Sequence, residues 1–147
     1  MEKVNYLYLC KAIADLSVLP VRLYEGTELI YSYSVVSLPA DPIKPFLKEV
    51  LPICDHVGYF VTPRFFTYGV LNAGGKKIVV GPTAQVIPTD QTLRELAFQS
   101  DVPKEEAQQF LDGVKSLTRM PLGTLLTMLC AVNHGKLSGQ NDLHRVG

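Results

Sequence analysis

Apolar residues near the start of the chain recur at helical spacing. Tyr6, Leu9, Cys10 and Ile13 occupy positions i, i+3, i+4 and i+7, which is typical of one face of an amphipathic helix. This spacing predicts a helix that ends near Ser17.

Two strands are predicted after this helix. Residues 21–24 form a short apolar run after Pro20, and residues 29–36 alternate between apolar and small polar side chains. The residues expected on one face of the second strand are Leu29, Tyr31, Tyr33 and Val35.

The segment from His56 to Pro82 predicts the rest of a sheet. Apolar residues alternate, residues 72–76 form a glycine-rich turn, and a second apolar strand follows. The pair Gly81-Pro82 is expected to end that strand. A short helix over residues 46–54, entered through a proline, precedes the segment.

Three helices are predicted in the last third of the chain. Asp90 can cap the first, and Pro103 opens the second. The third runs from about Pro121 to Gly135 and carries more apolar residues than one buried stripe requires. Such a surplus is buried either in the domain's own core or against a second copy, so we expect a homodimer. The leucines expected at its interface are Leu122, Leu125, Leu126 and Leu129.

This order of elements predicts an α+β domain with a PAS/GAF-like antiparallel sheet. About five strands are expected, with flanking helices against one face and a helical segment at the C-terminus. A fold of this class is compatible with many functions, so the function has to be inferred from a site.

Composition and charge exclude several classes of protein. The chain has 147 residues, 47% of them apolar, and its 14 basic and 14 acidic residues balance. A domain that binds nucleic acid by itself normally carries a basic excess or stripe, so we expect no nucleic-acid binding by this chain alone. No apolar run approaches the roughly 18 residues that a membrane span needs.

The three cysteines are scattered in apolar contexts and form no disulfide framework, and the first residues do not resemble a signal peptide. Both observations favour a cytoplasmic protein.

Three short clusters could carry chemistry, and each has a plainer explanation. Cys54 and His56 could form a nucleophilic pair, but no third group orients them, so we expect no enzyme. Cys130 and His134 have metal-compatible i, i+4 spacing, yet the only other ligands nearby, Asp142 and His144, lie in an apparent linker. Residues 72–76 fail the spacing of a phosphate loop. We therefore expect no metal and no cofactor.

Aromatic residues gather on the predicted strands and suggest a small-molecule site. Phenolic oxygens in an apolar cavity are sparse polar groups of the kind that orient a ligand, although ordinary core packing is the alternative. Pro63 interrupts the register, so alternation cannot show whether the tyrosines share one face. Arg64 could anchor an anion, with an exposed loop arginine as the alternative. The candidate ligand-binding residues are Tyr31, Tyr33, Tyr59, Arg64, Phe66 and Tyr68.

Two segments of the chain carry recognisable motifs. The first contains a strand with a tyrosine, a later Tyr-Gly pair and a Gly-Pro turn; the second contains a Pro-Leu-x-x-Leu-Leu-x-x-Leu-Cys helix. Together they resemble the N-terminal sensor region of AraC-type bacterial transcriptional regulators. The residues that carry the resemblance are Tyr59, Tyr68, Gly69, Gly81, Pro82, Pro121, Leu122, Leu125, Leu126, Leu129 and Cys130.

This resemblance implies a regulatory domain that binds an unknown small-molecule effector. Residues 1–100 would form the sensor core, residues 101–137 a helical signalling and dimerisation segment packed on it, and residues 138–147 a linker toward a missing DNA-binding domain. DNA would then be bound by that helix-turn-helix domain. The alternative is a protein-interaction or dimerisation module without a ligand.

Overall fold

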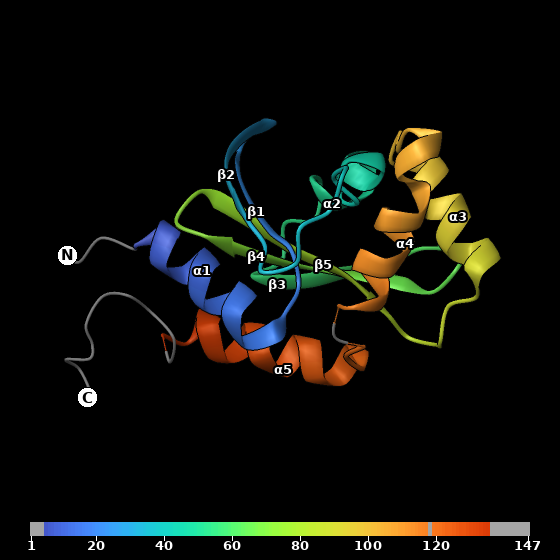
Figure 1. Cartoon of the computed structure of the whole chain (residues 1–147). Coiled ribbons are helices and arrows are strands. Elements are labelled where there is room, and N and C mark those ends of the chain that lie inside the picture. The colour runs from blue at the N-terminus through green and yellow to red at the C-terminus, as the bar shows by residue number, and fades with distance from the viewer. Residues whose placement is uncertain (1–4, 118, 136–147) are drawn as a thin grey trace.

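The computed structural model describes residues 5–117 and 119–135, which form one antiparallel sheet flanked by helices (Figure 1). The sheet has five strands in the order β2-β1-β5-β4-β3. The strands are β1 (Val21–Glu25), β2 (Glu28–Tyr33), β3 (Val57–Val61), β4 (Phe66–Ala73) and β5 (Lys76–Ala84). The helices are α1 (Tyr6–Ser17), α2 (Leu47–Val50), α3 (Asp90–Gln99), α4 (Ala107–Lys115) and α5 (Leu122–Asn133), with short 3-10 turns at Lys44–Phe46 and Lys104–Glu106. The predicted α+β fold is confirmed.

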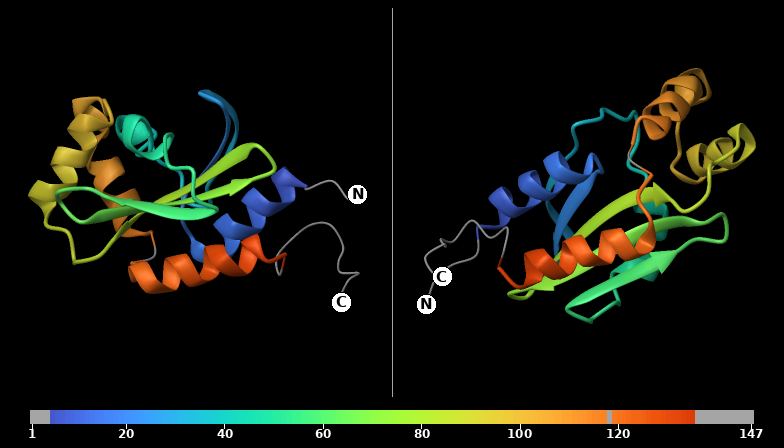
Figure 2. Two further views of the ribbon diagram at one scale, coloured as in Figure 1. Left: turned by 180° about the vertical axis from the view of Figure 1, so that it is seen from behind. Right: turned by 90° about the horizontal axis from the view of Figure 1, so that it is seen from below.

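Helices α1 and α5 lie side by side on one face of the sheet (Figure 2). Helix α1 buries Ile13 over β1 and β2, and α5 buries Leu125 and Leu129 over β3 and β4. A side chain at Gly69 would place its Cβ 2.6 Å from Leu129 Cδ1, so the glycine permits the close approach of α5 to the sheet.

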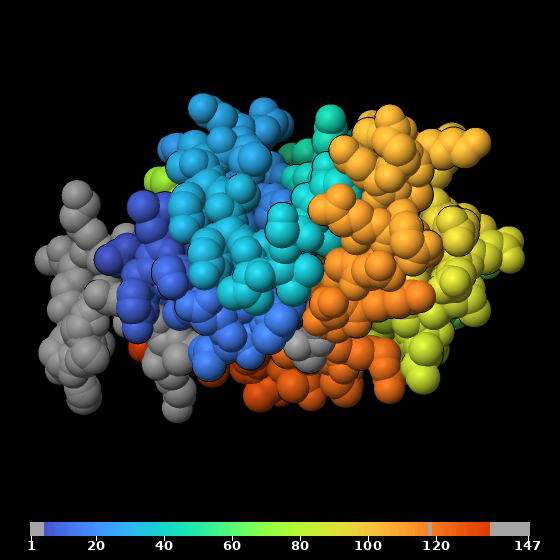
Figure 3. Space-filling view, viewed as in Figure 1, coloured from blue at the N-terminus to red at the C-terminus, as the bar shows by residue number. Residues whose placement is uncertain are grey.

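The opposite face is also covered, which corrects the expectation that helices pack on one face alone. Phe46, at the entrance to α2, packs on Tyr68 of β4 with ring centroids 5.4 Å apart. The segment over residues 34–46 fills the space between α1 and α4 (Figure 3). Its residue Leu38 lies against Gly113 of α4. The sheet is therefore enclosed between two layers.

Strand β2 differs from the prediction because of a bulge. The pairing with β1 shifts between Leu23 and Tyr24, so Leu29 pairs with Tyr24 while Tyr31 pairs with Leu23. A bulge places one extra residue in a strand, so the side chains on its two sides no longer follow one alternation between the faces of the sheet. Leu29 therefore faces away from Tyr31, and Val35 lies beyond the end of the strand.

The predicted hairpin is confirmed, but its second strand is longer than expected. Gly74 and Gly75 form the turn at φ 58° and 84°, values that favour glycine. The expected end at Gly81-Pro82 is wrong, since β5 continues to Ala84 through a register shift opposite Tyr68.

The helices after the sheet do not form one packed unit. The side chain of Thr89, rather than that of Asp90, caps α3 by accepting a hydrogen bond from the backbone N–H of Thr92. Helix α4 packs on α3, whereas α5 packs on β3 and β4 across the sheet. Helices α4 and α5 thus lie on opposite sides of the sheet (Figure 1). The predicted linker over residues 138–147 lies outside the described residues.

Candidate functional site

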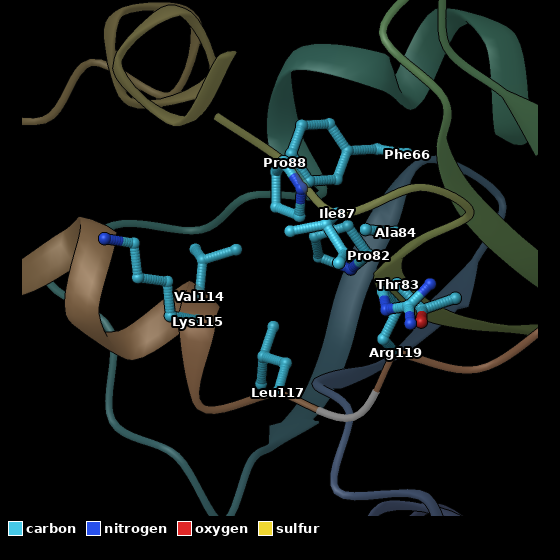
Figure 4. Close-up of a pocket in the computed structure, with 10 residues that line it drawn as sticks. All are labelled: Phe66, Pro82, Thr83, Ala84, Ile87, Pro88, Val114, Lys115, Leu117 and Arg119. Carbon is cyan, nitrogen blue, oxygen red and sulfur yellow. The ribbon is translucent and has the colours of Figure 1, made fainter. Parts of the chain in front are cut away.

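A cavity of about 260 Å³ lies where β4 begins and β5 ends, beside the end of helix α4 (Figure 4). It is built from five parts of the chain: the start of β4, the end of β5, the loop after β5, the end of α4 and the connection to α5. Its lining residues are Phe66, Pro82, Thr83, Ala84, Ile87, Pro88, Val114, Lys115, Leu117 and Arg119. The volume is near the lower limit of about 300 Å³ for small-molecule sites.

Secondary structure fixes the apolar walls of this cavity. Phe66 and Ala84 are paired across β4 and β5, so both side chains lie on the face toward α4. Val114 belongs to the buried stripe of amphipathic α4, and Leu117 follows one turn later. Ile87 is 75% exposed at the mouth of the cavity, which leaves an apolar entrance.

The connection before α5 is hydrogen-bonded to the end of β5, beside the cavity. The backbone N–H of Met120 donates to Thr83 Oγ1 over 2.7 Å. The side-chain amide of Gln85 donates to the carbonyl of Met120 over 3.1 Å and accepts from the N–H of Leu122 over 2.9 Å. These three bonds hold the start of α5 to the same strand end that forms the cavity wall.

Two cationic residues line the rim. The Lys115 ammonium lies 2.9 Å from the Asp90 carboxylate and points away from the cavity (Figure 4). A hydrogen bond from Lys115 and its positive charge lower the pKa of Asp90. Arg119 is exposed and forms no ion pair or hydrogen bond with a described residue. The rim therefore has one cation that is paired and one that is available.

Three of the tyrosines predicted to bind a ligand lie on the other face, with α1 and α5. Tyr33 donates a hydrogen bond from its hydroxyl to Asp15 of α1 over 3.1 Å, and Tyr31 shares its face by alternation. Tyr59 pairs with Gly69, which contacts α5, and is 50% exposed. None of the three lines the cavity under α4.

Tyr68 faces the 34–46 segment, where it is fully buried and its hydroxyl is satisfied by the protein itself. Its hydroxyl donates to the carbonyl of Pro42 over 2.7 Å. Burial, and then the negative charge of Asp41, raise the pKa of Tyr68 well above its ordinary value. The phenol thus remains a neutral donor that fastens the 34–46 segment to the sheet.

Arg64 is engaged by Glu95 of α3 in a two-pronged ion pair, with distances of 2.9 and 3.2 Å. Its side chain is 60% exposed, and it lines, together with Phe66 and Glu95, a smaller hollow beside α3. Among the predicted ligand-binding residues, Phe66 alone lines the cavity. The face that alternation left open is thereby assigned: Tyr31 and Tyr33 lie on the face of α1, whereas Phe66 and Tyr68 lie on the opposite face.

The hydrophobic periodicity of no single helix or strand in the sequence indicates this cavity. Val114 and Leu117 follow the ordinary pattern of a buried helix stripe, and Arg119 follows no pattern at all. They meet Phe66 only because the end of α4 lies beside the start of β4 and the end of β5.

The leucines predicted at a dimer interface separate into two pairs. Leu125 and Leu129 are fully buried in the domain's own core, which corrects their assignment to an interface. Leu122 and Leu126 are half-buried. Leu126 lines a second hollow, also about 260 Å³, between α5 and β3, together with Ile53, Asp55, Val57, Gly58, Tyr59 and Cys130.

The remaining clusters show no group of metal ligands in the part of the chain that is described. Cys54 is exposed, and no group of three His, Cys, Asp or Glu side chains gathers among residues 5–117 and 119–135. His134 follows the end of α5, and its possible partners Asp142 and His144 lie outside the described residues. The Lys77 ammonium donates to Asn72 Oδ1 and to the carbonyl of Ile53, which closes the hairpin turn.

No helix within the described segments has the length and apolarity to cross a bilayer.

Comparisons with protein-family models, with curated proteins and with solved structures find no match to this chain.

Proposed function

We propose that this chain is the ligand-sensing domain of a cytoplasmic transcriptional regulator. It binds a small metabolite in the cavity under α4 and signals through α5 to a separate helix-turn-helix domain. The observation that carries the proposal is the position of this cavity: its wall is the strand end to which the start of α5 is hydrogen-bonded. The resemblance to AraC-type regulators supports the regulatory role.

A ligand in the cavity can act on α5 through a short path. It contacts Thr83 and Ala84 on one side and Leu117 and Arg119 on the other. Moving these two walls relative to each other changes the bonds that Thr83 and Gln85 make to the residues before α5. A ligand shifts such an equilibrium only by its difference in affinity for the two arrangements.

The test is a screen of small metabolites by ¹H–¹⁵N NMR on the whole chain, with a variant that fills the cavity. Ala84→Leu adds volume inside the cavity, and Ala12→Leu adds the same volume to half-buried α1 as a control. We expect a compound whose binding shifts the resonances of cavity residues and of Met120. Ala84→Leu should abolish that binding, and Ala12→Leu should not.

Gln85→Leu separates binding from signalling. The variant should still bind the compound but lose the shifts along α5, because it can make neither of the two bonds that Gln85 forms there. Binding that survives Ala84→Leu, or no binding by any compound that the cavity can hold, would refute the proposed function.

The hollow between α5 and β3 favours a second candidate, a protein-interaction or dimerisation module. Tyr59 is half-exposed there, Leu126 is half-buried, and β3 is an edge strand with one unpaired side. Leu126→Glu should then lower the mass measured by sedimentation equilibrium, whereas Thr127→Glu on the exposed side of α5 should not. A wild-type chain that stays monomeric at tens of micromolar would remove this candidate. Leu125→Glu is unsuitable, because that residue belongs to the core.

A further inference from the structure

The cavity under α4 combines an apolar interior with a rim that carries two cations in different environments. Its walls include four buried apolar residues, Phe66, Pro82, Val114 and Leu117. Among the residues that the structure describes, no acidic residue lines it, and the two charged lining residues, Lys115 and Arg119, are cations. The chemistry of the site is therefore that of an apolar pocket with a positive edge.

The size of the cavity limits the body of a ligand. A dry cavity of about 150 Å³ holds one benzene molecule. The 260 Å³ available here accommodates one ring, or a branched chain of similar size, with a small polar substituent. Phe66 and the two prolines offer flat surfaces to such a body (Figure 4).

The two rim cations are not equivalent. Lys115 has its charge neutralised by Asp90 and is turned outward, so it competes poorly for a ligand. Arg119 has no ion-pair partner among the described residues and presents a planar guanidinium, which matches a carboxylate in two parallel hydrogen bonds. An anionic group is therefore best placed at the Arg119 edge.

Deepening the proposed function, on which this step rests, we infer that the ligand is a small carboxylic acid with a compact apolar body, whose carboxylate is bound by Arg119. Phe66, Val114 and Leu117 hold the apolar body. The choice of Arg119 also couples binding to the signal: the next residue, Met120, makes the backbone bonds to Thr83 and Gln85. When Arg119 moves toward a bound anion, it displaces the residues before α5 at the point where the bonds to Thr83 and Gln85 hold them.

The experiment compares acids with their uncharged amides, which match them in shape. The probes are benzoate with benzamide, phenylacetate with phenylacetamide, and isovalerate with isovaleramide, each titrated into the whole chain and followed by ¹H–¹⁵N NMR. Hydrogen bonds to charged groups are the stronger ones, so at least one acid should bind about 10- to 100-fold more tightly than its amide. The perturbed resonances should include those of Val114 and Leu117.

Variants locate the charge that selects the acid. Arg119→Gln should remove the preference for acid over amide, and Arg119→Lys should keep part of it. Arg94→Gln is the matched control, because Arg94 is an arginine of α3 that does not line this cavity. Ala84→Leu should weaken acid and amide together. Thermal melts of each variant establish that it is folded.

Three results would overturn the inference. Equal binding of acid and amide, or a preference that survives in Arg119→Gln, would show that the ligand is not selected as an anion at this residue. The cavity and the proposed function would then stand, because the probes still bind there. No perturbation by any acid would also reject the inference; the proposed function would be decided separately by the wider metabolite screen and its Ala84→Leu variant.

Discussion

Removing one oxygen atom from Tyr68 tests whether this side chain stabilises the fold or serves a ligand. In Tyr68→Phe the ring keeps its packing on Phe46, but the carbonyl of buried Pro42 loses the donor that lies 2.7 Å away. Leaving a buried acceptor without its partner costs about 1–3 kcal/mol. We therefore expect the free energy of unfolding to fall by about 2 kcal/mol.

The measurement is urea unfolding followed by circular dichroism, together with thermal melts. For a chain of this size, a loss of about 2 kcal/mol lowers Tm by about 4–8 °C. Tyr59→Phe is the control: its hydroxyl makes no hydrogen bond with a described residue and its side chain is half-exposed. Its change should stay within about 0.5 kcal/mol.

Two outcomes would contradict this reasoning. If Tyr68→Phe and Tyr59→Phe unfold at the same urea concentration, the bond to Pro42 does not stabilise the protein. If the Tyr68 phenol ionises near its ordinary pKa in a spectrophotometric titration, it is not buried as described, since burial holds its pKa well above that value.

Two other substitutions and two measurements on Cys10 test particular features of the core. Thr67→Val should raise the free energy of unfolding by about 1 kcal/mol in urea denaturation, because the buried Thr67 hydroxyl has no hydrogen-bond partner among the described residues; a loss of stability would show that it does have one. Gly69→Ala should lower stability by about 1–3 kcal/mol in the same assay, since its Cβ would overlap Leu129, and an unchanged midpoint would mean that α5 can move away at no cost. Burial raises the pKa of Cys10 to about 12, so a thiol reagent at pH 8 should modify the two exposed cysteines of the native protein and reach Cys10 only after denaturant is added. The neutral Cys10 thiol contributes stability fully below its unfolded pKa of about 9 and loses it as pH rises toward 12, so the midpoint of urea unfolding should decrease over that range.

Local patterns in the sequence were sufficient for most of the elements. The spacing of Leu9, Cys10 and Ile13 predicted α1 and its end at Ser17, and the glycines of the hairpin predicted the turn between β4 and β5. These features depend on residues a few positions apart, whose preferences act within one helix turn or one β-turn.

Boundaries shifted where a tertiary contact outweighed a local signal. The bulge in β2 reversed Leu29, and pairing with β4 carried β5 through the Gly81-Pro82 pair to Ala84. A strand can extend as far as it has a partner strand to pair with. The sequence of one strand does not show which strand that partner will be.

The sequence alone determined an α+β domain with its order of helices and strands, a balanced charge and an apolar last helix. Only the tertiary structure decided which face each aromatic residue occupies, that Leu125 and Leu129 belong to the core, and that Phe66, Val114 and Arg119 meet at one cavity. Alternation along a strand predicts that neighbouring side chains lie on opposite faces of the sheet. It does not predict which of the two faces a given helix will cover. The face that a side chain occupies depends on how the elements are connected. Helices α4 and α5 lie on opposite faces of the sheet (Figure 1), and the hydrophobic periodicity within each helix does not predict this placement.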